Sequence, residues 1–346
     1  MMPKITINGL DVQVENGATV FEAAEQAGIY IPTLCHHPDL PTFGGCRVCM
    51  VDADGKIVTA CRAPVKDGMV VKTDTEEVRK VRLTNVELLL ASHHKDCQSC
   101  SRNNTCKLQE VSAFVGISQD RMRRIRRSVE PVKPDDSNPF FHRDFTRCVL
   151  CGICIRTCEE INGVAAIDFA FRGFHTKVSV LGDKPIKDSQ CESCGECLVR
   201  CPTGALYLAE PVVAEREVES VCTYCGVGCG IKLGVRGDRV VKVEGNRDNP
   251  VNRGDLCVKG RFGHGFINHP ERLKKPLIKR DGIFVEASWD EALDFIADKM
   301  SEIKANHGAD ALGGISSARC TSEENYLFQK IFRAMGTNNV DHCARL

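Results

Sequence analysis

Cysteine is the residue type that most constrains how this chain can fold. The 346-residue sequence contains 21 cysteines, and 19 of them lie between Cys35 and Cys257. Cysteines in such groups form disulfides in an oxidising compartment and metal or redox centres in a reducing one. The opening residues, MMPKITINGL, contain neither a basic segment followed by an apolar run nor a pair of arginines, so we expect no export signal and a cytoplasmic protein. The cysteines are therefore predicted to bind metal.

The composition excludes two classes of protein. Lys and Arg number 46, and Asp and Glu also number 46, so the chain lacks the basic excess that is typical of nucleic-acid-binding proteins. No apolar run approaches the roughly 18 residues that a membrane-spanning helix requires. With 42% hydrophobic residues, the chain is predicted to be a soluble protein that does not bind nucleic acid and has no membrane span.

The N-terminal residues have the pattern of a small mixed domain. Two alternating apolar runs flank Asn8-Gly9, and two more flank Asp54-Gly55, which predicts two β-hairpins. Residues 18–28 carry the apolar spacing of a helix. These elements favour a β-grasp-like [2Fe-2S] domain over residues 1–78. A capping box of Asp74 and Glu77 is expected to open a helix that continues to residue 94.

The strongest motif is an internal repeat within residues 140–212. Cysteines 148–158 and 191–201 each follow the spacing C-x2-C-x2-C-x3-C of bacterial two-cluster ferredoxins, in which the fourth cysteine of each run ligates the other cluster. Zinc is the alternative for any C-x2-C pair, but two complete runs argue against it. Pro202 follows the second run as the motif expects, whereas Glu159 follows the first. One [4Fe-4S] cluster is assigned to Cys148, Cys151, Cys154 and Cys201, and the second to Cys158, Cys191, Cys194 and Cys197.

Two further ligand sets precede the repeat. The N-terminal cysteines lie on predicted loops that suit a [2Fe-2S] centre, and Gly44 and Gly45 would let the backbone donate hydrogen bonds toward sulfide, although zinc remains an alternative. This set is Cys35, Cys46, Cys49 and Cys61. The next set combines three thiolates with an imidazole: His93, Cys97, Cys100 and Cys106, with His94 as a competing ligand by position. Residues 121–139, basic and then rich in proline, are interpreted as a solvated linker rather than a site for an anionic partner.

These two motifs occur together, and in this order, in a known family. The first hundred residues resemble the N-terminal part of the large iron-sulfur subunit of respiratory complex I, a part shared with [FeFe] hydrogenases and cytoplasmic formate dehydrogenases. In that family the C-x10-C-x2-C set binds [2Fe-2S], and the H-x3-C-x2-C-x5-C set binds a [4Fe-4S] cluster through its histidine. The resemblance implies a [4Fe-4S] domain with one histidine and three cysteine ligands over residues 79–120, called the histidine-cysteine domain below, with His93 as a ligand.

A second resemblance chooses among those families. Four cysteines spaced C-x2-C-x3-C-x27-C resemble the [4Fe-4S] motif that opens the catalytic module of molybdenum and tungsten bis-pterin oxidoreductases; they are Cys222, Cys225, Cys229 and Cys257. The resemblance implies a cluster domain over residues 216–274, in which Lys259 lies between the cluster and the pterin. An ordinary surface lysine is the alternative. A hydrogenase would continue with different cysteine motifs, and complex I usually lacks the two-cluster insert.

Residues 275–346 are predicted to begin an α/β domain with a parallel sheet. Two capping boxes, Ser288 with Glu291 and Thr321 with Glu324, open helices around a short apolar run. The segment from residue 313 closely resembles formate dehydrogenase catalytic subunits, in which it helps bind the pterin dinucleotide. A strand-to-helix turn also suits a diphosphate because it offers free N–H groups, although serines before a helix are often only caps. The candidate pterin contacts are Ser316, Ser317 and Arg319, whereas Cys320 and Cys343 are interpreted as ordinary thiols.

Together these features predict an α+β multidomain protein: a β-grasp [2Fe-2S] domain, a histidine-cysteine [4Fe-4S] domain, a two-cluster ferredoxin domain, and the [4Fe-4S] domain and first part of an α/β bis-pterin domain. The resemblance implies the electron-transfer half of a formate dehydrogenase, which oxidises formate to CO2, or reduces CO2, at molybdenum or tungsten held by bis-molybdopterin guanine dinucleotide. Electrons are expected to pass from the Cys222 cluster through the ferredoxin pair and the His93 cluster to the [2Fe-2S] centre. The alternatives are an NADH-linked hydrogenase or complex I-like subunit, and a non-enzymatic polyferredoxin relay.

The expected partners and catalytic residues lie outside this sequence. A [2Fe-2S] domain of this kind usually meets a flavin-containing NAD(P)-reducing subunit, a ferredoxin or hydrogenase subunits, so we expect a hetero-oligomer. A G-x-G-x-x-G fingerprint after a strand is missing, in agreement with NAD binding elsewhere. The sequence ends at Leu346, one residue before the position where formate dehydrogenases carry a catalytic cysteine or selenocysteine. We hypothesise that an in-frame UGA at codon 347 encodes selenocysteine, with a truncated sequence as the alternative.

Overall fold

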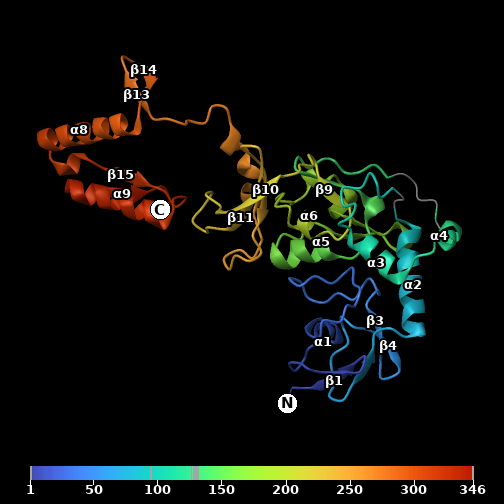
Figure 1. Ribbon diagram of the computed structural model, residues 1–346. Helices are drawn as coiled ribbons and strands as arrows, with labels where there is room; N and C mark the ends of the chain where they lie inside the picture. The colour runs from blue at the N-terminus through green and yellow to red at the C-terminus, as the bar shows by residue number, and fades with distance from the viewer. Residues whose placement is uncertain (1, 94–95, 126, 128–131, 345–346) are drawn as a thin grey trace. The chain divides into compact units, whose positions relative to one another are not determined.

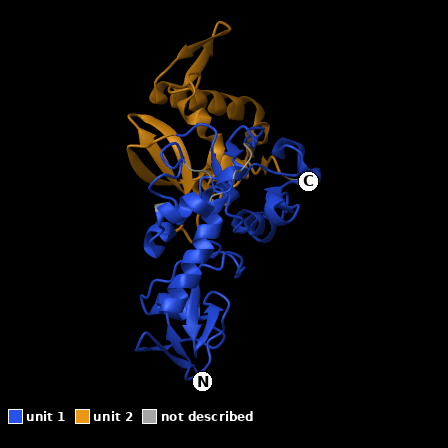
Figure 2. Ribbon diagram, turned by 90° about the vertical axis from the view of Figure 1, so that its right-hand side faces the viewer, with its two compact units in different colours: residues 1–211 blue, residues 212–346 orange. Residues whose placement is uncertain are grey.

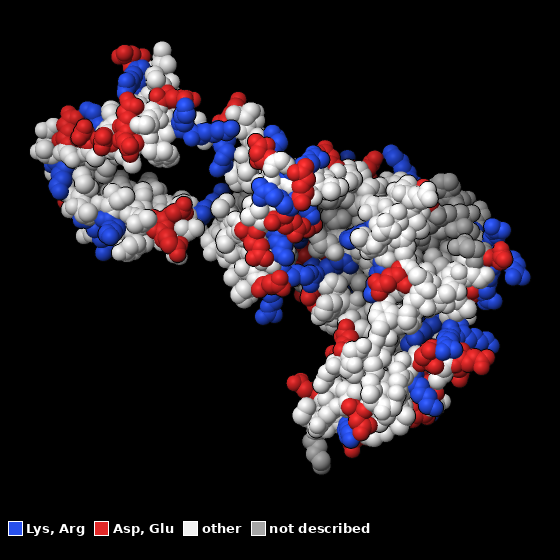
Figure 3. Space-filling model, in the orientation of Figure 1, with Lys and Arg blue, Asp and Glu red and all other residues white. Residues whose placement is uncertain are grey.

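The computed structural model describes residues 2–93, 96–125, 127 and 132–344. The chain divides into two compact units, residues 1–211 and residues 212–346 (Figure 2). In the described ranges, no helix is both long and apolar enough to cross a membrane. Basic and acidic side chains are intermixed over the face drawn in Figure 3, as the equal numbers of the two kinds lead one to expect.

The first unit opens with a five-stranded mixed sheet in the order β2-β1-β5-β3-β4 (Figure 1). The strands are β1 Lys4–Ile7, β2 Leu10–Gln13, β3 Met50–Ala53, β4 Lys56–Thr59 and β5 Val70–Lys72. Strands β1 and β5 run parallel, and the other neighbours run antiparallel. Asn8 and Asp54 each adopt a φ of 52° before a glycine, which is the backbone conformation of a type I′ hairpin turn. The two predicted hairpins are therefore confirmed.

Helix α1, Val20–Gln26, packs on this sheet as the sequence predicted. Thr19 caps it reciprocally: its Oγ1 accepts from the Glu22 N–H at 3.3 Å, and its own N–H donates to the Glu22 carboxylate at 2.7 Å. Phe21 of the helix and Ile7 of the sheet belong to one buried core. Burying a side chain of this size stabilises a fold by roughly 1.5–3 kcal/mol. The core of this domain therefore does not depend on its cysteines alone.

Helix α2 spans Glu76–Ala91, and its N-cap differs from the one expected. The Thr75 Oγ1 accepts from the backbone N–H three residues later at 3.2 Å. Asp74 instead forms an ion pair with Arg79 at 2.5 Å. The predicted capping box of Asp74 and Glu77 is therefore wrong, because an arginine one turn along the helix engages the aspartate.

Two further helices pack against α2: α3, Lys107–Val115, and α4, Gln119–Ile125. Helix α3 ends at Gly116, whose φ of 70° is the left-handed conformation that terminates many helices. Helix α4 is secured by an ion pair from Arg121 to the buried Glu87 of α2 at 2.6 Å. The predicted 121–139 linker therefore begins inside a helix.

The rest of the first unit consists of short elements around the two cysteine runs. Strand β6 pairs antiparallel with β9, and β7 pairs antiparallel with β8. The strands are β6 Phe141–Arg143, β7 Asp168–Ala170, β8 Lys177–Ser179 and β9 Leu206–Leu208, and the helices are α5 Ile153–Arg156, which continues into a wider turn over Thr157–Ile161, and α6 Glu196–Arg200. Single 3-10 turns occupy Phe145–Arg147, Gly173–His175, Leu181–Asp183 and Ile186–Asp188. Each of the two short helices begins inside a cysteine run, one residue before its third cysteine.

The second unit begins with a three-stranded antiparallel sheet in the order β10-β11-β12. Its elements are β10 Arg216–Val221, β11 Gly230–Arg236 and β12 Arg239–Gly245, followed by helix α7 Val258–Phe262, a 3-10 turn Gly263–Asn268 and the hairpin β13 Leu277–Arg280 with β14 Ile283–Glu286. Next come α8 Trp289–His307, a 3-10 turn Ala309–Ala311, β15 Gly314–Ser316, α9 Ser322–Met335 and β16 Val340–His342. Strands β15 and β16 are parallel, which agrees with the expected start of an α/β domain.

The two predicted capping boxes of this unit have different outcomes. Thr321 and Glu324 form the complete reciprocal box at the start of α9. Ser288 caps α8 by accepting from the Glu291 N–H at 3.1 Å. The Glu291 carboxylate, however, pairs with Arg280 of β13 rather than with the Ser288 backbone. This box is therefore only half formed.

The α2 cap is testable by substitution. Thr75→Ala is expected to lower the free energy of unfolding by about 1 kcal/mol, because it leaves one of the first N–H groups of α2 without its acceptor. Asp74→Ala should have a clearly smaller effect, because its ion pair with Arg79 is exposed to solvent. Urea denaturation followed by circular dichroism measures both. A larger loss for Asp74→Ala than for Thr75→Ala would restore the sequence-based cap.

Candidate iron-sulfur and pterin sites

The predicted [2Fe-2S] ligands lie together at the edge of the N-terminal domain. All four thiols are buried, and hydrogen bonds within the set shift the pKa of each one. The four are Cys35, Cys46, Cys49 and Cys61. A hydrogen bond from the Cys46 thiol is the main reason why the pKa of Cys35 is low, and the N–H groups of Gly45 and Gly44 add to it against the effect of burial. The backbone N–H of Cys46 also donates to the Cys35 sulfur at 3.5 Å. Hydrogen bonds of this kind favour the charged, metal-binding form of a thiol.

The predicted ligands of the histidine-cysteine site line one cavity of about 500 Å³. His93, Cys97, Cys100 and Cys106 all face it, and His94 lies outside the described residues. Burial raises the pKa of Cys106, the ligand at the start of α3. The four sequence-predicted groups are therefore brought to one place, with α2 and α3 as the rigid elements that support them.

One wall of this cavity comes from the second cysteine run. A Cβ added at Gly204 would overlap the Cys100 Sγ, so this position has no room for a side chain. The backbone N–H of Lys107 donates to the Pro202 carbonyl at 3.0 Å, which docks the turn after Cys201 onto the start of α3. The histidine-cysteine site therefore lies beside the end of the ferredoxin-like repeat.

The ferredoxin motif predicts that the two cysteine runs exchange their fourth members, and the electrostatic interactions between the thiols are consistent with this prediction. Electrostatic interactions join Cys148, Cys151 and Cys154 with Cys201. A second group joins Cys191, Cys194 and Cys197 with Cys158. Burial raises the pKa of Cys148 to about 11 and raises that of Cys197 further. Iron would offset this penalty, because a metal cation replaces the protons that buried thiols would otherwise retain.

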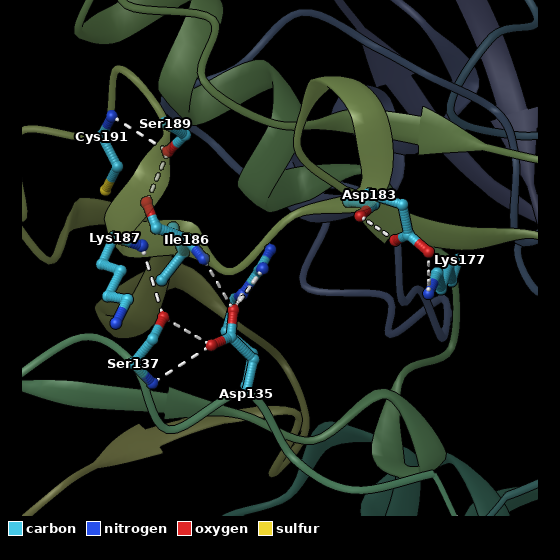
Figure 4. Close-up of polar contacts among 10 residues, drawn as sticks. Asp135, Ser137, Lys177, Asp183, Ile186, Lys187, Ser189 and Cys191 are labelled. Atoms are coloured by element: carbon cyan, nitrogen blue, oxygen red, sulfur yellow. Dashed lines mark hydrogen bonds and ion pairs between the residues drawn. The ribbon is translucent and has the colours of Figure 1, made fainter.

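Residues 135–138 hold the second cysteine run in place (Figure 4). The Asp135 carboxylate accepts from the Ser137 hydroxyl at 2.6 Å, from the Ile186 N–H at 2.9 Å and from an Arg143 Nη2 at 2.5 Å. Ser189 continues the chain of contacts: its hydroxyl donates to the Ile186 carbonyl at 2.6 Å and accepts from the N–H of Cys191 at 3.2 Å. Figure 4 shows this path from Asp135 to Cys191.

A second contact from the same segment reaches the next turn of the run. The buried Asn138 donates through its Nδ2 to the Ser193 hydroxyl at 2.8 Å, between Cys191 and Cys194. The interpretation of residues 121–139 as a solvated linker is therefore wrong at this end as well. The partners lie more than 50 positions away in sequence, so no local pattern could have indicated them.

The [2Fe-2S] set and the first ferredoxin set share one hydrophobic core. Cys35 and Cys46 lie in the same buried cluster as Val149, Cys151 and Ile153. The Cys35 charge also acts directly on Cys151. The first ferredoxin set therefore adjoins the [2Fe-2S] set directly, and Leu108 and Val111 of α3 lie in the same cluster. The order in which electrons pass the three sets stays a prediction.

The fourth predicted [4Fe-4S] set lies at one end of the three-stranded sheet of the second unit. Cys229 interacts electrostatically with Cys222, Cys225 and Cys257. Cys222 directly follows β10, Cys229 directly precedes β11, and Cys257 directly precedes α7. The Cys222 N–H donates to the Cys229 carbonyl at 2.8 Å and closes the loop between them. Lys259 follows in α7, where its side chain is exposed. In the part of the chain that the structure describes, no three His, Cys, Asp or Glu side chains are arranged to hold a single metal ion.

Of the predicted pterin contacts near the C-terminus, Ser316 ends β15, and Ser317 and Arg319 lie in the turn before α9. The Ser317 hydroxyl accepts from the Arg319 N–H at 3.1 Å, and Ser316 contacts Asn325. Neither serine caps α9, because Thr321 does so. The Cys343 thiol lies 3.7 Å from the Ser317 hydroxyl, and hydrogen bonding to that hydroxyl lowers its pKa. Cys343 is therefore an exposed thiol with local polar partners, which its sequence spacing did not indicate.

Five family models match successive parts of the chain. They are a 2Fe-2S iron-sulfur cluster binding domain at residues 2–76, the NADH-ubiquinone oxidoreductase-G iron-sulfur binding region at 82–121, a 4Fe-4S dicluster domain at 147–205, the molybdopterin oxidoreductase Fe4S4 domain at 215–269 and molybdopterin oxidoreductase at 272–346. The order of these domains agrees with the order predicted from the cysteine motifs.

Curated relatives match essentially the whole chain. NADPH-Fe(3+) oxidoreductase subunit alpha of Geobacter sulfurreducens is 38% identical over 100% of this chain and 40% of its own length. A subunit of NADH-quinone oxidoreductase from Rhizobium meliloti is 36% identical over 99% of the chain and 40% of its own length. A Staphylococcus aureus protein provisionally named a formate dehydrogenase is 33% identical over 99% of the chain and 39% of its own length. The chain thus spans about 40% of the length of the relatives it matches.

A solved structure resembles part of the chain. A chain of the crystal structure of NAD+-reducing [NiFe]-hydrogenase in the H2-reduced state is 30% identical, with a TM-score of 0.56. The match covers 60% of this chain and 87% of that chain.

The close approach at Gly204 generates the first prediction for the site. Gly204→Ala is expected to displace Cys100 and to lose the iron of one [4Fe-4S] cluster, because the added methyl group would meet the Cys100 sulfur. Iron content per chain and electron paramagnetic resonance (EPR) of the reduced protein measure the loss. Gly265→Ala is the matched control, since nothing lies within 4 Å of a Cβ at that position. Retention of every EPR signal in Gly204→Ala would contradict the placement of Cys100.

The Asp135 contacts predict a specific pH dependence. Burial would raise the pKa of Asp135, but hydrogen bonds from Ser137, Arg143 and Ile186 outweigh it and bring the pKa from 3.8 to about 2. The stabilisation by the ionised carboxylate is therefore complete above about pH 4 and is lost as the pH falls toward 2.

Asp135→Asn is expected to lower the urea midpoint by an amount that stays constant from about pH 7 to 4.5 and shrinks only below about pH 4. Ser137→Ala is a matched variant, because it removes one donor and keeps the carboxylate. A difference between wild type and Asp135→Asn that already disappears near pH 6 would show that another group provides the stabilisation.

Proposed function

Because the chain joins the domains of a molybdopterin oxidoreductase to 2Fe-2S and 4Fe-4S domains and an NADH-ubiquinone oxidoreductase-G-like region, we propose that it is the electron-transfer half of a formate dehydrogenase. The reaction would oxidise formate to CO2, or reduce CO2, at a molybdenum or tungsten bis-pterin centre. The observation that supports the proposal most is the succession of iron-sulfur and molybdopterin oxidoreductase domains along one chain, in the order expected from the cysteine motifs. Resemblance of residues 313–346 to formate dehydrogenases supports the choice of substrate.

The residues of the chain would bind and insulate the cofactors. Iron-sulfur clusters, when bound, accept and release single electrons at potentials set by their ligands and surroundings. Cys35, Cys46, Cys49 and Cys61 would bind the [2Fe-2S] cluster, and the other four sets described above would bind [4Fe-4S] clusters. The four thiols of the [2Fe-2S] site are buried, whereas Cys225 and Cys257 are exposed. Water would therefore reach the [2Fe-2S] cluster less readily than the cluster of the Cys222 set. Lys259, Ser316, Ser317 and Arg319 remain the proposed contacts to the pterin.

The proposed partner is a flavin-containing subunit that reduces NAD(P), or a ferredoxin. The names of the Geobacter and Rhizobium relatives and of the hydrogenase refer to NADPH, NADH and NAD+, which supports a nicotinamide-linked assembly. The Cys35 set lies in the N-terminal domain, so we propose that this domain meets the partner.

A second candidate function is a subunit of an NAD(P)H-linked oxidoreductase whose substrate is not formate. The likeness to a chain of the NAD+-reducing hydrogenase favours it, as do the two relatives of 38% and 36% identity. Both functions use the same cysteine sets. The substrate alone distinguishes them.

Reduction of the clusters by substrate tests the choice. The full protein, expressed anaerobically and purified with its cofactors, is expected to contain molybdenum or tungsten and to show reduced-cluster EPR signals within seconds of formate addition. NAD(P)H added to the protein together with its flavin partner is the comparison. Cluster reduction by NAD(P)H with none by formate, in protein that contains metal and pterin, would overturn formate as substrate and favour the second candidate. Iron without molybdenum, tungsten or pterin would favour a simple relay.

A further inference from the structure

Arg156 reaches from the first ferredoxin set into the loop of the [2Fe-2S] set. It is the last residue of α5, between Cys154 and Cys158, and it is 8% exposed. Its Nη2 donates to the carbonyl of Cys35 at 2.7 Å, and its Nη1 donates to the carbonyl of Pro41 at 2.5 Å. One guanidinium therefore bonds the backbone of two residues in the loop that carries the first thiol of the [2Fe-2S] set.

Phe43 makes the reciprocal contact in the opposite direction. A Cβ added to Gly152, between Cys151 and Cys154, would lie 3.2 Å from the Phe43 ring. The same ring is so close to Gly45 that a Cβ there would overlap it. The Arg156 guanidinium carbon lies 5.2 Å from the ring centroid, within range of a cation-π interaction. Each cysteine loop thus inserts one side chain into the other.

The charge of Arg156 has no carboxylate partner among the residues that the structure describes. Its Nε is buried and makes no hydrogen bond within the described part of the chain, and its other bonds go to neutral carbonyls. A buried cation is costly unless an anion compensates it. Arg156 lies between Cys154 and Cys158 in sequence and bonds the carbonyl of Cys35, so ligands of both predicted sets are its neighbours along the chain or through this bond. The arrangement therefore places a fixed positive charge where a cluster would bring negative charge.

We propose that Arg156 is a positioning residue that joins the two cluster-binding loops and favours one-electron reduction of the [2Fe-2S] centre. The Cys148 and Cys35 sets would hold the two clusters, which when bound would exchange a single electron with no bond or proton changing place. The added negative charge is stabilised by the nearby guanidinium, which lies outside bulk water. The inference rests on the proposed cluster-binding function, but it is independent of formate as the substrate.

Three variants of the full, cluster-loaded protein separate charge from hydrogen bonding. Arg156→Gln removes the charge, Arg156→Lys keeps the charge but not the paired carbonyl contacts, and Arg79→Gln removes an exposed charge from the same unit as the control. A redox titration followed by EPR measures the [2Fe-2S] midpoint potential. For Arg156→Gln we expect the equilibrium constant for reduction to fall about tenfold, which is ~59 mV more negative for one electron. Arg156→Lys and Arg79→Gln should each change the equilibrium constant for reduction by less than about threefold.

A second measurement tests the positioning role. Magnetic coupling between the two reduced centres broadens their EPR signals, so a looser contact should narrow them in both Arg156 variants and not in Arg79→Gln. An unchanged potential in Arg156→Gln with full iron content would overturn the electrostatic role. Unchanged broadening in a fully loaded Arg156→Lys would overturn the positioning role. If Arg156→Gln does not bind iron, the EPR signals of Arg156→Lys decide whether Arg156 has the positioning role. If wild type also lacks the EPR signals, the proposed cluster-binding function is contradicted instead.

Discussion

The need to compensate buried thiols is the constraint on which the first unit depends. Burial raises the pKa of Cys148, Cys151 and Cys197 and thereby opposes their thiolate form. Nearby N–H groups offset part of this penalty at Cys35, and bound iron would offset the remainder. The fold accordingly contains few long elements in this region. Short helices, tight turns and polar side chains fix the cysteine loops where a larger protein would use a continuous core.

Contacts between loops, more than regular secondary structure, determine which of the predicted cluster sites lie next to each other. The turn after Cys201 forms a wall of the histidine-cysteine cavity through Gly204. Phe43 and Arg156 connect the [2Fe-2S] loop to the first ferredoxin set. The ferredoxin-like repeat therefore borders two other sites, although it lies after both in the sequence. Proximity in this protein follows the packing of loops and not the order of domains along the chain.

Local patterns were sufficient where the physical cause is itself local. Asn8-Gly9 and Asp54-Gly55 form the predicted turns because only residues that tolerate a positive φ fit there. Thr321 and Glu324 form their box because both partners lie within one helical turn. The Cys148 and Cys191 runs were recognised because ligand spacing reflects the geometry of a single cluster. Asp74 was mistaken for a cap because Arg79 competes for it.

Long-range partners could not be predicted, and Asp135 and Arg156 are the clearest cases, since each bonds backbone groups far away in sequence.

The predicted exchange of cysteines between the two runs has a consequence for biogenesis. In the predicted assignment, Cys201 completes the set that begins at Cys148, and Cys158 completes the set that begins at Cys191; the electrostatic interactions of these thiols are consistent with it. During synthesis neither site can acquire its full ligand set until the chain has been translated through the second run. Under this assignment, iron delivery to the pair would be concerted and late.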